Sequence, residues 1–214
     1  MFNFSSKTEV NKEYKLSDFL KQIKASKEVK DDAKKIKKIF FKNVLNNYTL
    51  NCEEDEKYKN IYVIEILLLT DSIPRLFLEE LDKNINFHTY YIFKYEDEIS
   101  TWIAYKEINR KTIVDKKYYI HDFHKDTLIE LPIINNVKDA YREILAYEIG
   151  RPYRASESPE EYISRIKLIA KLEFQISKTE KAIQYETQPK KKFEYNARLR
   201  DYKKEYADLL KVEE

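Results

Sequence analysis

The alternation of apolar and polar positions is most informative between residues 61 and 107. Residues 61–69 are apolar except for Glu65, and this run predicts a strand buried on both faces. Residues 71–74 then offer a side-chain cap and a proline for a first helical turn, and apolar residues recur at helical spacing through Ile85. The pattern therefore predicts a strand followed by a helix of about three turns.

Two further apolar runs, at residues 87–95 and 99–105, are rich in β-branched and aromatic residues and are separated by an acidic turn. This arrangement is typical of a β-hairpin. Shorter runs at 114–123 and 128–131 predict strands that complete the antiparallel part of a sheet. The centre of the chain is thus expected to fold as strand, helix, strand, strand, with two more strands to follow.

The first fifty residues are expected to be mainly helical. Ser17 can cap a short helix, and Ser26 can cap a longer one whose apolar stripe continues to residue 44. That stripe consists of Val29, Ala33, Ile36, Phe40 and Val44. Residues 47–51 then predict a short strand before a charged loop.

Helices dominate the C-terminal third. Asn135 or Asn136 can cap a helix over residues 137–149, and Gly150 stands where a helix end favours a left-handed residue. Residues 158–161 form a capping box with proline at the first helical position. Apolar and aromatic residues then recur in steps of three and four on both sides of Pro189, which predicts two long helices folded back as an antiparallel hairpin. Glu173 and Glu180 interrupt the apolar seam of the first helix, so this seam is expected to have basic partners across it or a third helix beside it.

These elements predict an α+β fold: a mixed β-sheet with a strand-helix-strand-strand core, flanking helices and a C-terminal antiparallel helical hairpin that is coiled-coil-like. A chain of 214 residues is long enough for one main domain with such an appendage. The expected organisation is a core domain at residues 1–150, a linker at 151–158 and the hairpin at 159–214.

Composition narrows the classes of function. The single cysteine, Cys52, excludes an internal disulfide framework and a cysteine-based zinc site, and it fits a cytoplasmic protein. The single glycine, Gly150, excludes the usual glycine-rich phosphate loops, so no cofactor is predicted. No apolar run is long enough to span a membrane. Residues 1–50 carry 12 basic and 6 acidic side chains, whereas residues 51–135 carry 11 and 17, so any anion-binding surface must be local.

Four stretches carry a family resemblance. They are Lys7-Thr-Glu-Val-Asn-Lys12, the predicted strand at 61–68, Ala104-Tyr-Lys-Glu107 and Phe193-Glu-Tyr-Asn-Ala-Arg-Leu199. On these stretches the chain resembles a family of bacterial proteins classed as domain of unknown function 4391. The resemblance implies a context and no established reaction: such proteins accompany DNA methyltransferase and helicase genes in restriction-like, anti-phage neighbourhoods.

Glu65 is the most informative single residue, because a carboxylate inside an apolar strand is costly unless it is paired, protonated or bound to a metal ion. Lys106 on the hairpin can approach it, and a carboxylate and a lysine on neighbouring strands form part of the magnesium site of restriction-type nucleases. The pattern is incomplete, because Ala104 stands two residues before the lysine and an acid follows it as Glu107. A structural ion pair, or an edge position facing water, is the favoured interpretation.

His121 and His124 are two histidines close in sequence to carboxylates, among them Asp126. Residues three apart in a regular strand face opposite sides, so a shared metal ion would require a loop or a bulge. No metal is predicted, and these two residues are the candidates that remain if one is bound.

Basic residues near aromatic ones are candidates for nucleic-acid binding, because they combine phosphate contact with stacking. These candidates are Lys7, Lys12, Arg151, Arg154, Lys190, Lys191 and Lys192. A stripe on the last helix is interpreted first as helix packing and second as a surface for a partner protein. This stripe consists of Tyr195, Leu199, Tyr202, Tyr206 and Leu209.

The leading hypothesis is a non-catalytic accessory or adaptor protein of a bacterial restriction-like or anti-phage DNA-modification system. It would engage a partner protein, such as a methyltransferase or helicase subunit, through the hairpin and approach DNA through basic patches. One alternative is a divergent magnesium-dependent nuclease centred on Glu65 and Lys106. The other is a structural protein that forms homo-oligomers through the hairpin.

Overall fold

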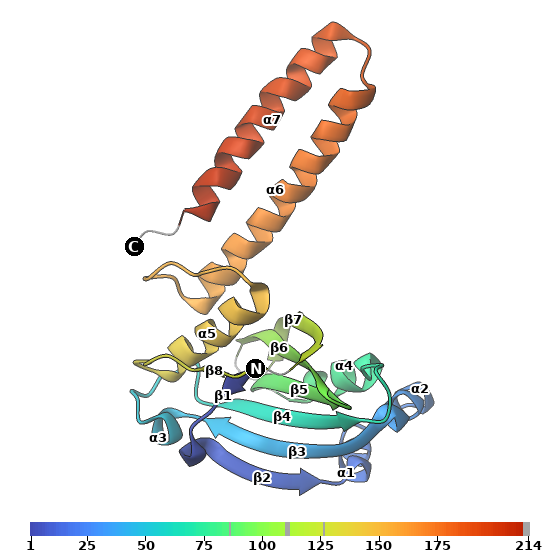
Figure 1. Cartoon of the computed structure of the whole chain (residues 1–214), viewed down its shortest axis with the longest axis vertical. Coiled ribbons are helices and arrows are strands. Elements are labelled where there is room, and N and C mark those ends of the chain that lie inside the picture. The colour runs from blue at the N-terminus through green and yellow to red at the C-terminus, as the bar shows by residue number, and fades with distance from the viewer. Residues whose placement is uncertain (86, 110–111, 126, 212–214) are drawn as a thin grey trace. The chain divides into compact units, whose positions relative to one another are not determined.

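The computed structural model describes residues 1–85, 87–109, 112–125 and 127–211, and Figure 1 shows its elements. The chain divides into two compact units, Met1–Arg151 (unit 1) and Pro152–Glu214 (unit 2). Unit 1 contains a mixed sheet flanked by helices, and unit 2 contains a helical hairpin. The fold class is therefore α+β, as predicted. No helix in the described part of the chain combines the length and the apolar composition that a membrane span requires.

Six strands of the described residues form one mixed sheet in the order β2-β3-β4-β5-β6-β7. They are β2 (Glu9–Tyr14), β3 (Ile36–Leu45), β4 (Ile61–Leu68), β5 (His88–Tyr95), β6 (Glu98–Asn109) and β7 (Thr112–Lys125). Strands β4 and β5 are parallel and are joined through α4 (Arg75–Lys83), and the other neighbouring pairs are antiparallel. The predicted strand-helix-strand-strand core is confirmed.

The end of the sheet differs from the prediction. The run at 128–131 contains β8 (Ile129–Glu130), which pairs in parallel with β1 (Phe2–Asn3) in a separate two-stranded sheet. It therefore does not extend the main sheet, because the N-terminal strand, which the sequence pattern did not reveal, provides its partner.

The N-terminal helix prediction is wrong in its second half. Helix α1 (Leu16–Gln22) forms, but Ser17 is its second residue and does not cap it, because the helix begins after Lys15 without a side-chain cap. The Ser26 hydroxyl caps α2 (Lys27–Asp32) as predicted, by accepting a hydrogen bond from the Val29 amide. The chain then passes through a 3-10 turn (Ala33–Lys35) into β3. The segment from residue 36 is rich in β-branched and aromatic residues, and pairing with β2 and β4 overrides its helical spacing.

Two further short elements were missed or assigned to the wrong type. A 3-10 helix (Ser6–Thr8) leads into β2, and α3 (Asn47–Leu50) is a helix where a strand was predicted. The Asn46 side chain caps α3 by accepting hydrogen bonds from the amides of Tyr48 and Thr49. A local side-chain cap therefore decides the structure of this segment.

The start of α4 depends on a distant residue. The expected cap within residues 71–74 does not form a side-chain hydrogen bond to the helix. Instead, the Asp32 carboxylate at the end of α2 accepts hydrogen bonds from the amides of Leu76 (2.8 Å) and Phe77 (3.2 Å). The other oxygen of Asp32 pairs with Lys35 at 2.7 Å.

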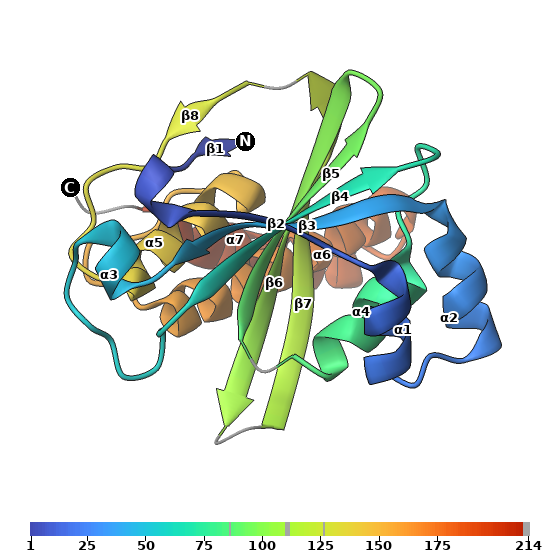
Figure 2. The same cartoon turned by 90° about the horizontal axis from the view of Figure 1, so that it is seen from below.

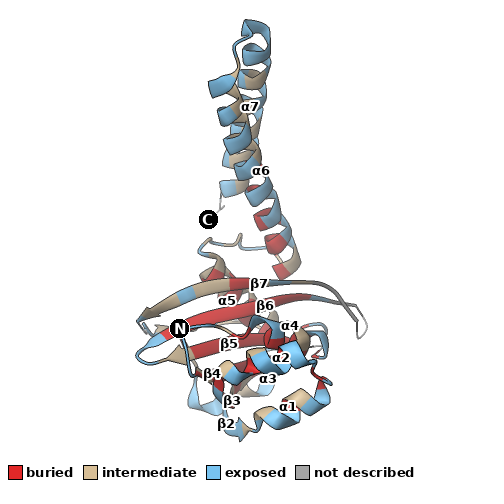
Figure 3. Cartoon of the chain, turned by 90° about the vertical axis from the view of Figure 1, so that its right-hand side faces the viewer, coloured by how far each residue is buried: buried red, intermediate tan, exposed pale blue. Residues whose placement is uncertain are grey.

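The helices cover the main sheet on both faces. Helices α1, α2 and α4 lie on one face (Figure 2). Their apolar side chains form a core with strand residues such as Ile64, Phe93 and Trp102. Helix α5 (Val137–Ile149) lies on the opposite face and begins and ends as predicted, at Asn136 and at the left-handed Gly150. Most of the described residues of β4, β5 and β6 are buried (Figure 3).

Unit 2 consists of α6 (Pro159–Tyr185) and α7 (Pro189–Leu210) in an antiparallel hairpin. The capping box at its start is confirmed, because the side chains of Ser158 and Glu161 each accept a hydrogen bond from the other's amide. Buried side chains of α6 end at Leu172, and none of the 22 residues of α7, all of them described, is buried. Most of the hairpin is therefore in contact with water (Figure 3).

Candidate functional site

The structure does not bring Glu65 and Lys106 together. Glu65 lies in one cross-strand row with Ile92 and Thr101, and its carboxylate pairs with Lys94 at 2.9 Å. Lys106 is five residues beyond Thr101 on β6, an odd number, so it points to the opposite face of the sheet. Glu65 is therefore one half of a partly exposed ion pair. The neighbouring candidate Glu107 is exposed and registers with Asp115 on β7.

Lys106 instead pairs with Asp82 on α4 at 2.5 Å, and neither side chain is exposed. Its ammonium also donates to the carbonyl oxygens of Ile85 and Phe87, both at 3.1 Å, so its three donors all have acceptors. Burial lowers the pKa of Lys106, and the attraction of Asp82 opposes that shift.

The Asp82 carboxylate is saturated as well. Besides Lys106, it accepts hydrogen bonds from the hydroxyl groups of Thr89, Tyr91 and Tyr118. Burial, reinforced by the charge of Asp82, raises the pKa of Tyr91 well above its usual value. The cluster fixes the end of α4 to three strands and leaves no acid or base available to a substrate.

A third acid, Glu148 on α5, is fully buried on the other face of the sheet. Its Oε1 accepts hydrogen bonds from the hydroxyl groups of Tyr90 (3.0 Å) and Thr101 (2.8 Å), and its Oε2 lies 3.5 Å from Nδ1 of His121. Burial raises the pKa of Glu148 to about 7, against the lowering effect of these hydrogen bonds. Burial likewise lowers the pKa of His121, and His124 adds to that shift. Glu148 is thus a buried acid that gains or loses its proton near neutral pH.

His121 and His124 lie closer together than a regular strand would place them. The register of β6 and β7 shifts between the pairs at His124 and His121, so β7 has a bulge, and the two imidazole rings are 5.6 Å apart. The bulge that a shared metal ion would require is present. Even so, the described residues contain no group of three or more His, Cys, Asp or Glu side chains placed to hold a metal ion. Asp126 lies outside the described residues.

The basic candidates near the N-terminus and the linker occupy different environments. Lys7 and Lys12 are exposed, and the Lys12 ammonium lies 4.9 Å from the ring centroid of Tyr14. Arg151, the last residue of unit 1, is half-buried. Arg154 in unit 2 donates to the carbonyl oxygens of Asp208, Leu209 and Lys211, so its guanidinium binds the C-terminal end of α7.

A second arginine reinforces this end of α7. Arg165 forms a two-pronged ion pair with Glu157, at 2.6 and 2.7 Å, and also donates to the carbonyl oxygen of Leu209. Burial alone would raise the pKa of Glu157, but the hydrogen bonds from Arg165 and Arg154 outweigh it and lower that pKa. These arginines hold the two ends of the hairpin together.

The predicted partner-binding stripe of α7 lies on the side that faces α6. Its five residues are all half-buried: Tyr195, Leu199, Tyr202, Tyr206 and Leu209. The Tyr206 hydroxyl donates to Glu173 at 3.0 Å, and Lys203 pairs with Glu180 at 2.7 Å. The two glutamates that interrupt the apolar seam of α6 thus have partners on α7. Helix packing accounts for this stripe, and partner binding stays a prediction.

The opposite side of α6 carries a row of basic and aromatic side chains, which we call the outer face. It consists of Lys167, Lys171, Phe174, Lys178, Lys181 and Tyr185, all exposed. Their steps of three and four residues place them about half a turn from Ile176 on the α7-facing side. Phe174 is 69% exposed and Tyr185 is 81% exposed, although side chains of this size are usually covered. No acidic residue interrupts the outer face, because Glu173 and Glu180 point towards α7.

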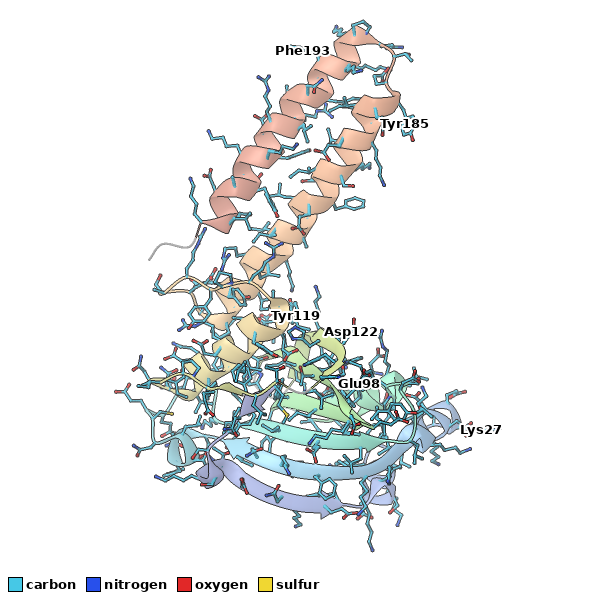
Figure 4. All side chains as sticks on the ribbon, viewed as in Figure 1. Lys27, Glu98, Tyr119, Asp122, Tyr185 and Phe193 are labelled. Atoms are coloured by element: carbon cyan, nitrogen blue, oxygen red, sulfur yellow. The ribbon has the colours of Figure 1, made fainter. Side chains whose placement is uncertain are left out.

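More basic and aromatic residues occur at the tip of the hairpin, where Tyr185 ends α6 and Phe193 lies in the first turns of α7 (Figure 4). Lys190, Lys191 and Lys192 form the first turn of α7 and are exposed. That turn contains no acidic residue and has no side-chain cap. Cations at a helix N-terminus oppose the helix dipole, so this arrangement costs stability and favours a functional explanation.

Family membership follows from the extent of the match. The family model for a domain of unknown function, DUF4391, matches residues 2–205. The chain belongs to the DUF4391 family. The matched DUF4391 range includes the whole main sheet and the hairpin up to the last turn of α7. Comparisons with curated proteins and with solved structures gave no match.

In this DUF4391 chain, sequence reasoning identified the lysines at the tip but missed the outer face of α6. The signal was present, because lysine and aromatic residues recur there at helical spacing. The apolar side of α6 packs against α7, so the opposite side of α6 is the strongest candidate for a binding surface.

Proposed function

We propose that this DUF4391 chain is a non-catalytic accessory protein of a bacterial restriction-like or anti-phage system, and that it binds nucleic acid through the outer face of α6. The observation that carries this proposal is the separation of charge on that helix. Glu173 and Glu180 pair with α7, whereas Lys171, Lys178 and Lys181 are exposed and form no ion pair among the described residues.

The electrostatics of the distal hairpin suit a polyanion. Residues 167–204 carry 11 basic and 5 acidic side chains. Phosphate contacts from lysine account for most of the affinity of sequence-independent nucleic-acid binding. Exposed aromatic rings such as Phe174 and Tyr185 add stacking on unpaired bases. A basic row with interleaved aromatic residues therefore fits a nucleic-acid backbone better than it fits an acidic protein, which would leave the rings without a partner.

The non-catalytic part of the proposal is supported by the state of the buried acids. Glu65 is paired with Lys94, and Asp82 is saturated by one ammonium and three hydroxyl groups. A general acid or base must be within reach of its substrate. The Asp82 side chain has no exposed surface, so a substrate does not reach it. The Glu65 carboxylate is already paired with Lys94.

The direct test is salt-dependent binding of a fluorescent DNA duplex, measured by anisotropy. We expect Lys171→Gln, Lys178→Gln and Lys181→Gln, combined in one variant, to weaken binding and to reduce the slope of log Kd against log salt by about 3, roughly one for each phosphate that is no longer neutralised. The matched control combines Lys34→Gln, Lys38→Gln and Lys83→Gln in unit 1, where each lysine is exposed and ion-paired. Equal losses in the two variants would show a general charge effect and overturn the proposal.

A protein partner is a second candidate, favoured by the absence of any buried residue in α7. A two-helix hairpin that stays half-exposed along its seam gains stability if another helix covers it. Co-purification with the products of adjacent methyltransferase and helicase genes would test this candidate. Self-association is the competing outcome, and a sedimentation mass of one chain would exclude it.

A further inference from the structure

Unit 1 contains a pocket of about 470 Å³ that is lined by residues of α1, of the end of α4 and of the neighbouring strands. Figure 2 shows these two helices on the same face of the sheet. Its volume lies within the range of small-molecule sites. Four aromatic residues line it, namely Tyr14, Phe19, Phe41 and Phe87. None of the buried clusters described above uses this space.

The aromatic residues form a continuous wall. Neighbouring ring centroids are 6.0 Å apart for Phe19 and Tyr14, and 4.8 Å apart for Tyr14 and Phe41. Tyr62 continues the row to Phe87, with centroids 4.2 Å apart. Tyr14, Phe41 and Phe87 are half-buried, so each ring retains surface that the protein does not cover. Such a wall suits a flat aromatic ligand.

Polar groups stand at the same pocket. Asp18 and Gln22 lie one turn apart on α1, and Asn84 follows the last residue of α4. The amide nitrogen of Asn84 donates to the Glu80 carbonyl oxygen at 2.9 Å, a bond that does not use its Oδ1. Together a carboxylate and two amides can both donate and accept, as recognition of a base edge requires.

The floor of the pocket is held in place by the buried ion pair. Lys106 donates to the carbonyl oxygens of Ile85 and Phe87, and both of these residues line the pocket. A wall fixed before the ligand arrives reduces the entropy lost on binding. This gives the Asp82 and Lys106 pair a role in shaping a site that it does not itself enter.

A second hollow, of about 460 Å³, lies on the other flank of α1. Lys21, Lys24 and Lys30 line it, are exposed, and form no ion pair among the described residues. One short helix thus separates an aromatic pocket from a hollow with three ammonium groups. The aromatic pocket suits the bases of a nucleotide strand, and the hollow lined by lysines suits its phosphates.

We propose that the aromatic pocket between α1 and α4 binds a nucleobase of a single strand, while Lys21, Lys24 and Lys30 hold neighbouring phosphates. Bases in a duplex are stacked and paired, so a base enters such a pocket only from a single strand or after leaving the duplex. This inference deepens the proposed nucleic-acid function, but it stands on unit 1 alone.

The test uses the full chain and three probes: a short DNA single strand, a strand of equal length without bases, and a free nucleoside monophosphate. We expect the strand with bases to bind about tenfold more tightly than the strand without bases, the effect of stacking one base. Tyr14→Leu and Gln22→Ala should each reduce that ratio towards one. Gln22 is exposed, so its variant keeps the fold. Tyr48→Leu, at a tyrosine that is 86% exposed, is the matched control and should leave the ratio unchanged.

The outcomes separate this inference from the hairpin proposal. Hairpin variants should weaken binding of the duplex and of both strands while preserving the ratio between strands. Pocket variants should change the ratio and leave duplex binding unaltered. If the free monophosphate binds about as tightly as the single strand, and if Gln22→Ala abolishes that binding, the same base site also accepts free nucleotides. Equal affinity for strands with and without bases, together with no binding of the monophosphate, would overturn the inference.

Discussion

In unit 1, the buried charged side chains each interact with several neighbouring groups. In the distal part of unit 2, by contrast, the charged side chains are exposed to water. Asp82, Lys106 and Glu148 have no exposed side-chain surface, while the lysines of the outer face are all exposed. Buried charges organise elements because leaving one unpaired is costly. Exposed charges contribute little to the fold, and their side chains are accessible to a ligand. Lysine therefore serves the structure in unit 1, and in unit 2 it forms part of the binding surface that we propose.

The largest expected effect comes from breaking the buried ion pair. Lys106→Met leaves the Asp82 carboxylate buried without its cation, and we expect the free energy of unfolding to fall by about 3–5 kcal/mol. Urea denaturation would measure this loss. Asp82→Asn combined with Lys106→Met removes both charges and should recover part of it. A loss below about 1 kcal/mol in the single variant would mean that this pair behaves like a surface pair.

An intermediate effect is expected from the pH dependence of Glu148. Its pKa rises from a usual value of 4.5 to about 7 in the folded chain. Between these values the folded chain keeps a proton that the unfolded chain has lost, so stability falls as pH rises. We expect the wild type to lose about 2–3 kcal/mol relative to Glu148→Gln between about pH 5 and about pH 7.5.

This difference between the wild type and Glu148→Gln isolates the carboxylate. The lowered pKa of His121 acts in the opposite sense, because an unfolded histidine binds more protons in this range, and it is present in both proteins. Urea unfolding at the two pH values measures the difference. Parallel pH profiles would show that Glu148 is ionised in the folded chain.

The smallest expected effect is a gain of stability in unit 2. Lys191→Glu places an anion in the first turn of α7, where it complements the helix dipole, and should stabilise that helix by about 0.3–1 kcal/mol. Hydrogen exchange of α7 amides would detect slower opening. The same variant should bind nucleic acid less tightly. Unchanged or weaker protection would contradict the view that the tip lysines are retained for binding at the expense of stability.

The fold was predictable where local signals agree. The apolar run of β4, the hairpin of β5 and β6, and the caps at Asn136, Gly150 and Ser158 are all present in the structure. Prediction failed at β3, where helical spacing and β-branched residues conflicted. The neighbouring strands decided that conflict, and β2 itself lies in a polar segment without an apolar run.

The candidate sites were less predictable because they depend on register and distance. The sequence indicated that Glu65 needs a partner, but the choice of Lys94 over Lys106 follows from the order and pairing of β4, β5 and β6. Asp82 was not singled out, although it is the true partner of Lys106. The aromatic pocket is lined by residues of α1, β2, β3 and the end of α4. Because the sequence pattern predicts a helix where β3 forms, it does not predict this pocket.

The cap that Asp32 provides to α4 bears on how unit 1 folds. The segment from residue 61 to 107 carries the clearest sequence pattern, yet the first turn of its helix is completed by a side chain 44 residues before Leu76. A peptide of that segment would lack the cap, and its helix would fray. The stability of α4 therefore depends in part on the position of α2, which couples the N-terminal segment energetically to the central one.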